Sequence, residues 1–112
     1  MMESDRASAP VVSVVVPTRN NRRTIEACLQ SVRAQTYSAI ELITVDNSST
    51  DGTDEISRRI ADVATTAGPE RSAQRNLGFE LARGEWVLWL DSDMVLPPTA
   101  VAVAMALPLD VS

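Results

Sequence analysis

The chain has 112 residues, 45% of them hydrophobic, which fits one globular domain with a single core. A net charge of −5 and the absence of lysine argue against nucleic acid as a partner. The single cysteine, Cys28, excludes an internal disulfide, and without histidine any acid–base or metal chemistry must use carboxylates, hydroxyls or arginine.

The chain opens with a polar leader, a buried strand and an amphipathic helix. Residues 1–10 are small and polar, so we expect a disordered leader ahead of a domain over 11–107. Residues 11–16 are an almost uninterrupted β-branched run, which predicts a strand buried on both faces that ends at Pro17. A helix is expected to begin near Asn21 or Thr24, because one apolar stripe follows at helical spacing: Ile25, Cys28, Leu29 and Val32.

A second strand and a second helix follow, separated by a dense cluster of turn residues. The strand is predicted over 41–46 and the turn over 47–52. Asp51 or Thr53 is expected to cap the helix, whose inner face would hold Ile56, Ile60 and Val63. Residues 63–66 fit either a short third strand or the frayed end of this helix.

The last elements are a third helix, a strand and a short C-terminal helix. Gly68-Pro69 is expected to open the third helix, and Gly84 stands where a helix stop belongs. The apolar run 86–90 predicts a strand buried on both faces, which would place Trp86 and Trp89 in the sheet core. After Pro97-Pro98, residues 99–107 could form a helix leaning on the sheet. Strands alternating with helices predict the α/β class, a Rossmann-like parallel sheet flanked by helices.

Aspartates end two of the predicted strands. Asp46 closes one strand, and Asp91 and Asp93 follow the other. The carboxyl ends of parallel strands share one edge of a sheet, so we expect these carboxylates to converge there with Thr18. Such a cleft needs donors or a cation, and a divalent ion with a diphosphate would fill it. The alternative is that Asp46 begins a loop as an Asx-turn residue and that the Asp-x-Asp triplet is only a turn.

Four segments in order resemble the nucleotide-binding half of family 2 glycosyltransferases with the GT-A fold: VSVVVPTRNN, QTYSAIELITVDNSSTDGT, GPERSAQRNLGFELARGEW and VLWLDSDMVLPP. The resemblance covers about residues 11–98. It implies transfer of a sugar from a nucleotide-sugar donor, with inversion at the anomeric carbon and with Mg²⁺ or Mn²⁺ as cofactor. The ion would bridge the diphosphate and stabilise its charge as the sugar leaves.

The resemblance also implies roles for individual residues. Asp93 resembles the direct metal ligand, and Asp91 the partner that reaches the metal or the donor ribose, with Ser92 between them. The other residues implied in donor binding are Pro17, Thr18, Arg19 and Asn20 around the base, Asp46 and Asn47 at its edge, and Arg75 and Asn76 facing the donor. Without the resemblance, Arg75 reads equally well as a solvated helix residue and Thr18 as a strand-end hydroxyl.

Two positions depart from the family pattern. Asn47 stands where many members carry a second aspartate, which changes the hydrogen bonds available to a base because an amide also donates. Arg19 stands where an aromatic residue is common.

The chain also departs from the family in length. Inverting transfer needs a general base near the acceptor hydroxyl, and Asp110 is the sole acid after Asp93, so no catalytic base is assigned. The chain is expected to be the donor-binding part of a longer enzyme, apparently truncated after the Asp-x-Asp motif and lacking the acceptor subdomain. The alternative is a truncated, non-catalytic nucleotide-binding or interaction domain. A nucleotidyltransferase ranks last, because residues 17–20 contain no glycine.

Partners and location complete the expectations. The acceptor is unknown and could be a saccharide, a lipid or a small molecule. A sheet without its second half would expose a strand edge, which predicts self-association. No apolar run approaches the roughly 20 residues of a membrane helix, so we expect a cytoplasmic protein, peripheral to a membrane at most in a longer form.

Overall fold

A computed structural model describes residues 10–107. The predicted leader therefore lies outside the described residues except for Pro10, as does Asp110. The elements are β1 (Val12–Thr18), α2 (Arg22–Arg33), β2 (Ile40–Asp46), α3 (Thr53–Ile60), β3 (Val63–Thr66), α4 (Arg71–Leu81), β4 (Trp86–Trp89) and α5 (Ala100–Ala106). Every strand pair is parallel, and the strands lie in the order β3-β2-β1-β4. The predicted α/β class with a parallel sheet flanked by helices is confirmed.

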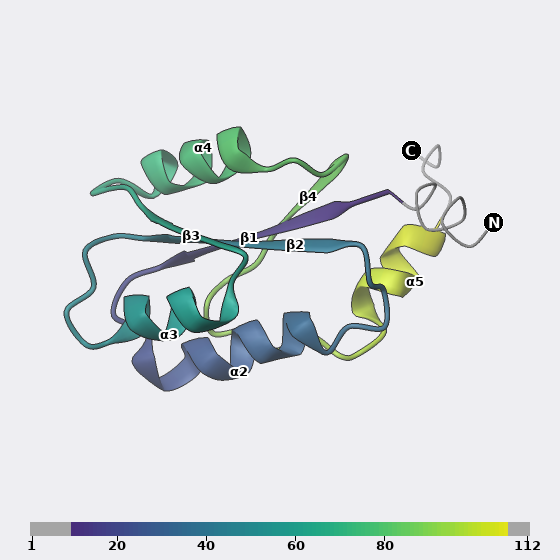
Figure 1. The fold of residues 1–112 in the computed structure, drawn as a ribbon, viewed down its shortest axis with the longest axis horizontal. Coiled ribbons are helices and arrows are strands. Elements are labelled where there is room, and N and C mark those ends of the chain that lie inside the picture. Colours follow the sequence, from purple (N-terminus) through teal and green to yellow (C-terminus); the bar gives the residue numbers. More distant parts are fainter. Residues whose placement is uncertain (1–9, 108–112) are drawn as a thin grey trace.

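The helices cover both faces of the sheet. Figure 1 shows α4 on one face, α2 and α3 on the other, and α5 beside the end of the sheet where β1 begins. All of the strands therefore end at the opposite edge of the molecule. There β1 and β2 reach Thr18 and Asp46, which are direct neighbours in the sheet.

The core is built from the alternation of side chains along β1. Val14 and Val16 pack with Leu42 against α2, whose predicted apolar stripe is buried as expected. Val15 points to the opposite face, where it packs with Ile43 beneath α4. Burial of β1 on both faces is thus confirmed, and the hydrophobic run of the sequence is explained by helices on each side.

Pro17 does not end the first strand as predicted, because β1 continues to Thr18. The N–H of Leu90 donates to the carbonyl oxygen of Val15 at 3.0 Å, and β4 ends at Trp89. Pro17 lies two residues beyond Val15, so its nitrogen faces past the end of β4, where no ladder hydrogen bond is lost.

The prediction that β4 is buried on both faces is wrong. β4 is an edge strand, and Trp86 and Trp89 are each 42% exposed instead of lying in the sheet core. A run of apolar residues carries no information about how many neighbours a strand has in the sheet. The prediction therefore assumed a second neighbour that the described residues do not provide.

Several boundaries also differ from the predictions. Residues 63–66 form the strand β3 and not the frayed end of a helix. Val63 therefore does not belong to the inner face of α3, contrary to the prediction. The N-cap of α3 is Gly52 with φ of 96°, although the Asp51 carboxylate does accept a hydrogen bond from the Thr53 N–H at 3.0 Å. α4 begins at Arg71, after Pro69, and ends at Leu81, so Gly84 lies in the following turn.

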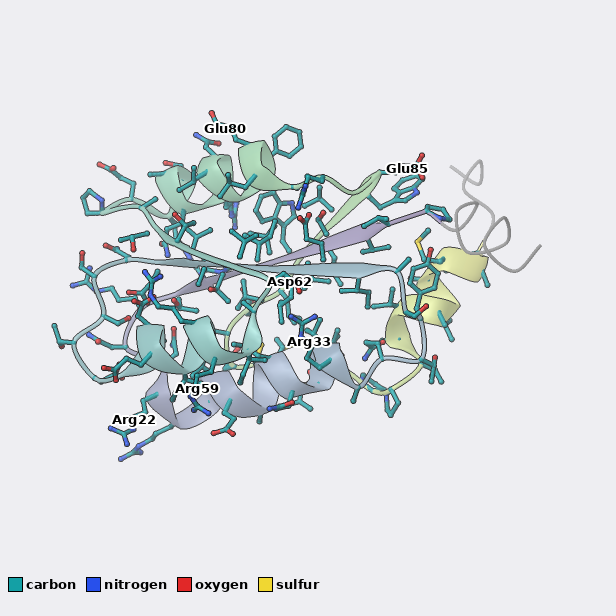
Figure 2. The ribbon with its side chains drawn as sticks, in the orientation of Figure 1. Arg22, Arg33, Arg59, Asp62, Glu80 and Glu85 are labelled. Carbon is teal, nitrogen blue, oxygen red and sulfur yellow. The ribbon has the colours of Figure 1, made fainter. Side chains whose placement is uncertain are left out.

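Polar contacts fasten the loops to the sheet. Arg33 of α2 and Asp62, which precedes β3, point toward one another in Figure 2, with Nη2 and Oδ1 3.0 Å apart. Asp62 also accepts from the Leu42 N–H at 2.8 Å, and Arg33 donates to the carbonyl oxygen of Ile60. These bonds hold the short β3 beside β2. Within residues 10–107, no helix is long and apolar enough to cross a membrane.

Candidate functional site

A cleft of 310 Å³ lies at the carboxyl ends of β1 and β2, between the start of α4 and the loop after β4. This is the edge at which ligands bind in open α/β sheets. The cleft brings together several residues expected at the site: Pro17, Thr18, Arg19, Asn47 and Ser92. It is completed by residues that the sequence reasoning missed: Asn21, Pro69, Arg71 and Gln74.

Asp46 does not line this cleft: it is only 2% exposed and is bonded to Thr18, which does line it. Its Oδ1 accepts hydrogen bonds from the hydroxyls of Thr18 and Ser49, each at 2.6 Å, and its Oδ2 accepts from the Ser49 N–H at 2.8 Å. These bonds make Asp46 the anchor of the turn after β2. This role is close to the alternative prediction, in which Asp46 begins the loop as an Asx-turn residue. They also satisfy a buried carboxylate that would otherwise be costly.

Asn47 lines the cleft and is held by both its backbone and its side chain. Its backbone N–H continues the sheet ladder by donating to the carbonyl oxygen of Thr18 at 2.9 Å. Its side-chain Nδ2 donates to the carbonyl oxygen of Pro69 at 3.0 Å, which fixes which end of the amide carries the oxygen. Asn47 Oδ1 is thus left as an acceptor in a residue that lines the cleft.

The two aspartates after β4 stand in exposed positions. The Asp91 side chain is 71% exposed, and its Oδ1 lies 3.9 Å from Arg71 Nη2. Asp93 lines a separate hollow of 290 Å³ with Asn20, Arg22, Asp51 and neighbouring residues of α2. The predicted convergence of Asp46, Asp91 and Asp93 is wrong, since no three Asp, Glu, His or Cys side chains meet in residues 10–107 in a group that could hold a metal ion. Asp46 is turned to the β2 turn instead.

The donor set at Asp91 and Asp93 nevertheless suits a hard divalent ion. Mg²⁺ and similar ions keep several waters and are held by one or two carboxylates together with the phosphates of a substrate. Nearby Cys28 is fully buried, and its soft sulfur is a poor match for a hard ion. Burial and then the charges of Asp93 and Asp91 raise the pKa of this thiol to about 11. The thiol donates to the carbonyl oxygen of Asp91 at 3.6 Å and so helps to place this loop.

The expected donor-facing residues of α4 lie on the exposed side of the helix. Arg75 and Asn76 are exposed and do not line the cleft, whereas Arg71 and Gln74, earlier on the same helix, do. Arg71, Gln74 and Gly78 follow the helical spacing i, i+3 and i+7, and Gly78 packs on Val15. That spacing is the signal that could have identified them. Arg19 and Arg71 give the cleft its positive charge, which suits a phosphate.

Comparisons with known proteins agree with this architecture. The family model described as glycosyl transferase family 2 matches residues 13–107. The uncharacterized glycosyltransferase YibD of Escherichia coli K12 is 30% identical over 105 residues, a match that covers 88% of this chain and 30% of that protein.

Solved structures give the same picture. S. aureus TarS 1–349 in complex with UDP superposes with a TM-score of 0.76 at 30% identity, over 86% of this chain and 31% of TarS. The mannosyltransferase PcManGT from Pyrobaculum calidifontis, in complex with GDP-Man and Mn²⁺, superposes with a TM-score of 0.69 at 32% identity, over 79% of this chain and 29% of that one. The chain thus spans about a third of the length of these proteins.

Proposed function

The chain belongs to glycosyl transferase family 2, and from this premise we propose that it forms the nucleotide-sugar-binding part of a glycosyltransferase. The observation that carries the proposal is the cleft at the carboxyl ends of β1 and β2, with two arginines and three amide side chains on its walls. TarS with UDP and PcManGT with GDP-Man support a nucleoside diphosphate as the ligand. In this proposal the base lies by Pro17, Thr18 and Asn47, and the diphosphate extends toward Arg71 and Ser92.

Asp91 and Asp93 are the proposed ligands of Mg²⁺ or Mn²⁺. The Mn²⁺ in the PcManGT structure supports this cofactor, as does the exposure of the two carboxylates. When bound, the ion would supply Lewis-acid stabilisation of the charge that develops on the diphosphate. Arg71 lies close enough to Asp91 to share in offsetting that charge.

Transfer with inversion is the proposed reaction of the whole enzyme. It requires a base that removes the proton of the acceptor hydroxyl, and no residue of this chain is assigned to that task. The acceptor, whether saccharide, lipid or small molecule, is likewise unassigned.

We also propose a cytoplasmic location, which cell fractionation would test. In addition, we propose that the chain self-associates through the exposed edge of β4.

A second candidate function is a nucleotide-binding or interaction domain without transferase activity. It is favoured by one observation: the buried carboxylate of Asp46, expected at the donor site, is engaged by Thr18 and Ser49 in the turn after β2. Hydrolysis of a nucleotide sugar, or sugar transfer, by the 112-residue chain alone would exclude this alternative.

The decisive experiment is calorimetric titration of the chain with UDP, GDP and dTDP, in the presence of Mn²⁺ or of EDTA. We expect metal-dependent binding of one nucleotide that is lost in Asp93→Asn. Asp54→Asn is the matched control, because Asp54 is paired with Arg58 on α3 and does not line the cleft. A cooperative melting curve would show that the chain is folded. If the folded chain binds none of these nucleotides, the proposed function is refuted.

A further inference from the structure

Gln74 is a buried polar residue of α4 that reaches the ends of two strands. It is 4% exposed, and its Nε2 donates to the carbonyl oxygen of Val45 at 2.8 Å and to that of Thr18 at 3.1 Å. Val45 belongs to β2 and Thr18 to β1, so one side-chain amide joins both strands to the helix above them.

The orientation of this amide follows from its partners. Both partner atoms are carbonyl oxygens, which only accept hydrogen bonds, so the NH₂ group must face them and the amide oxygen must point elsewhere. An apolar side chain of similar length would fill the same space without the desolvation cost of an amide. The polar contact therefore goes beyond what packing of α4 requires.

The strand ends that Gln74 fastens carry the walls of the cleft. Thr18 and Asn47 both line it, and the Asn47 N–H donates to the same Thr18 carbonyl oxygen that Gln74 holds. The Thr18 hydroxyl in turn donates to Asp46, the anchor of the next turn. A shift of the Thr18 carbonyl would therefore displace both Thr18 and Asn47, the two residues that lie next to the proposed position of the base.

We propose that Gln74 is a positioning residue for the nucleotide: its amide sets where Thr18 and Asn47 stand, and through them how the base is held. This rests on the proposed function of the cleft. Gln74 acts through its neighbours, and its contribution should appear in the affinity for the nucleoside part of the ligand and leave the metal–diphosphate contacts unchanged.

The test compares Gln74→Met with wild type in two calorimetric titrations, one with the nucleotide that binds (UDP or GDP) and one with inorganic pyrophosphate, both with Mn²⁺. Methionine keeps the length and burial of the side chain but has no donor. We expect the affinity for the nucleotide to fall about tenfold and the affinity for pyrophosphate to stay within about twofold. Gln74→Glu should lose at least as much, because a carboxylate would face two carbonyl oxygens.

Ser57→Ala is the matched control. Ser57 is fully buried on α3 and donates to the Thr53 carbonyl oxygen, so the variant loses a buried hydrogen bond between two residues that do not line the cleft. It should bind the nucleotide as wild type does. Amide hydrogen exchange of the ligand-free chain adds a second readout, and Gln74→Met should exchange the Asn47 N–H faster than wild type.

Each outcome has a definite meaning. Wild-type affinity of Gln74→Met for the nucleotide would overturn the role of Gln74 alone. Equal losses for nucleotide and pyrophosphate, or an equal loss in Ser57→Ala, would also overturn it, because they would indicate general loosening. A wild-type chain that binds no nucleotide would overturn the proposed function and, with it, the role of Gln74 toward a nucleotide.

Discussion

At the scale of single residues, Asp46 shows how a motif position can serve the fold. Its carboxylate accepts three hydrogen bonds while almost fully buried. Removing it leaves two hydroxyls and one backbone N–H without their acceptor, and hydrogen bonds to a charged group are worth about 1.5–3 kcal/mol each. We expect Asp46→Ala to lower the free energy of unfolding by about 3 kcal/mol or more, measured by urea denaturation.

Asp54→Ala is the matched control for this prediction. Asp54 is also an aspartate with a nearby partner, but its ion pair with Arg58 is an exposed i, i+4 contact. Such pairs contribute about 0.3–0.5 kcal/mol. Equal losses in the two variants would mean that the network around Asp46 is not the anchor of the β2 turn.

Some residues of the candidate site could be placed from the sequence, and others could not. The sequence places Thr18, Asn47 and Ser92 at the cleft because each lies at or shortly after the end of a strand, and strand ends meet at one edge. It cannot place Gln74, whose role depends on the distance between α4 and the sheet. It also cannot show that Asp46 bonds to Ser49 while Asn47 lines the cleft and donates to Pro69, since polar residues where a strand passes into a turn have no fixed period.

At the scale of elements, the packing of α4 on β1 depends on a glycine. A Cβ at Gly78 would lie 2.4 Å from Cγ1 of Val15, which is fully buried. Overpacking of this kind costs about 1–3 kcal/mol, more than the gain of about 1 kcal/mol from replacing glycine in a helix. We therefore expect Gly78→Ala to lower the melting temperature.

The cause can be tested with a second substitution. Val15→Ala creates space under Gly78, so the double variant should be more stable than the sum of the two single losses predicts. Glu80→Ala, at an exposed position of the same helix, should stay within about 0.5 kcal/mol of wild type. A Gly78→Ala variant that is more stable than wild type would place α4 farther from β1 than in the structure.

The connection between α4 and β4 depends on a carboxylate. The Glu41 side chain is 12% exposed and accepts hydrogen bonds from the Ser13 hydroxyl at 2.8 Å and from the Arg83 N–H at 2.9 Å. Burial alone would raise the pKa of Glu41. The Arg83 N–H, the Ser13 hydroxyl and the Arg83 guanidinium outweigh burial and hold that pKa below its ordinary value of 4.5.

The sign of the pH dependence follows from this direction. A carboxyl group whose pKa is depressed by folding stabilises the protein above its unfolded pKa, and that contribution is lost as the pH falls through the folded pKa. We expect Glu41→Gln to be less stable than wild type by about 1–2 kcal/mol at neutral pH and to lose less stability on acidification below 4.5. Urea denaturation at neutral and acid pH measures both. If Glu41→Gln loses as much stability on acidification as wild type does, that loss of stability belongs to other groups, such as Asp62.

Element prediction succeeded where a local pattern determined the outcome. The stripe of α2 and the two-sided burial of β1 follow from periodicity, and both are confirmed. The errors at Pro17 and at Trp86 and Trp89 have one physical cause. Both predictions depend on which strand lies next to the residue and on how far that strand extends. The tertiary fold determines the neighbours in a sheet, so the local sequence carries no signal for them.

At the scale of the whole molecule, the two sheet edges differ in character. Both edge strands have four residues, but β3 ends in two threonines, whereas β4 carries Trp86 and Trp89, each 42% exposed, with no further strand beside it in residues 10–107. An apolar edge with free backbone N–H and C=O groups is a template for pairing with another strand. Two copies present the same edge, so antiparallel β4–β4 pairing would bury both of them in a symmetric contact.

We therefore predict that the 112-residue chain self-associates and that Trp89→Lys weakens the association, because a charge on the edge opposes pairing. Sedimentation velocity over a range of concentrations measures this. Phe79→Lys is the matched control, since it also replaces an exposed aromatic residue with lysine but on α4. A monomeric wild-type chain at all concentrations would contradict the prediction. Association weakened equally by both substitutions would assign it to general hydrophobic contact and not to the β4 edge.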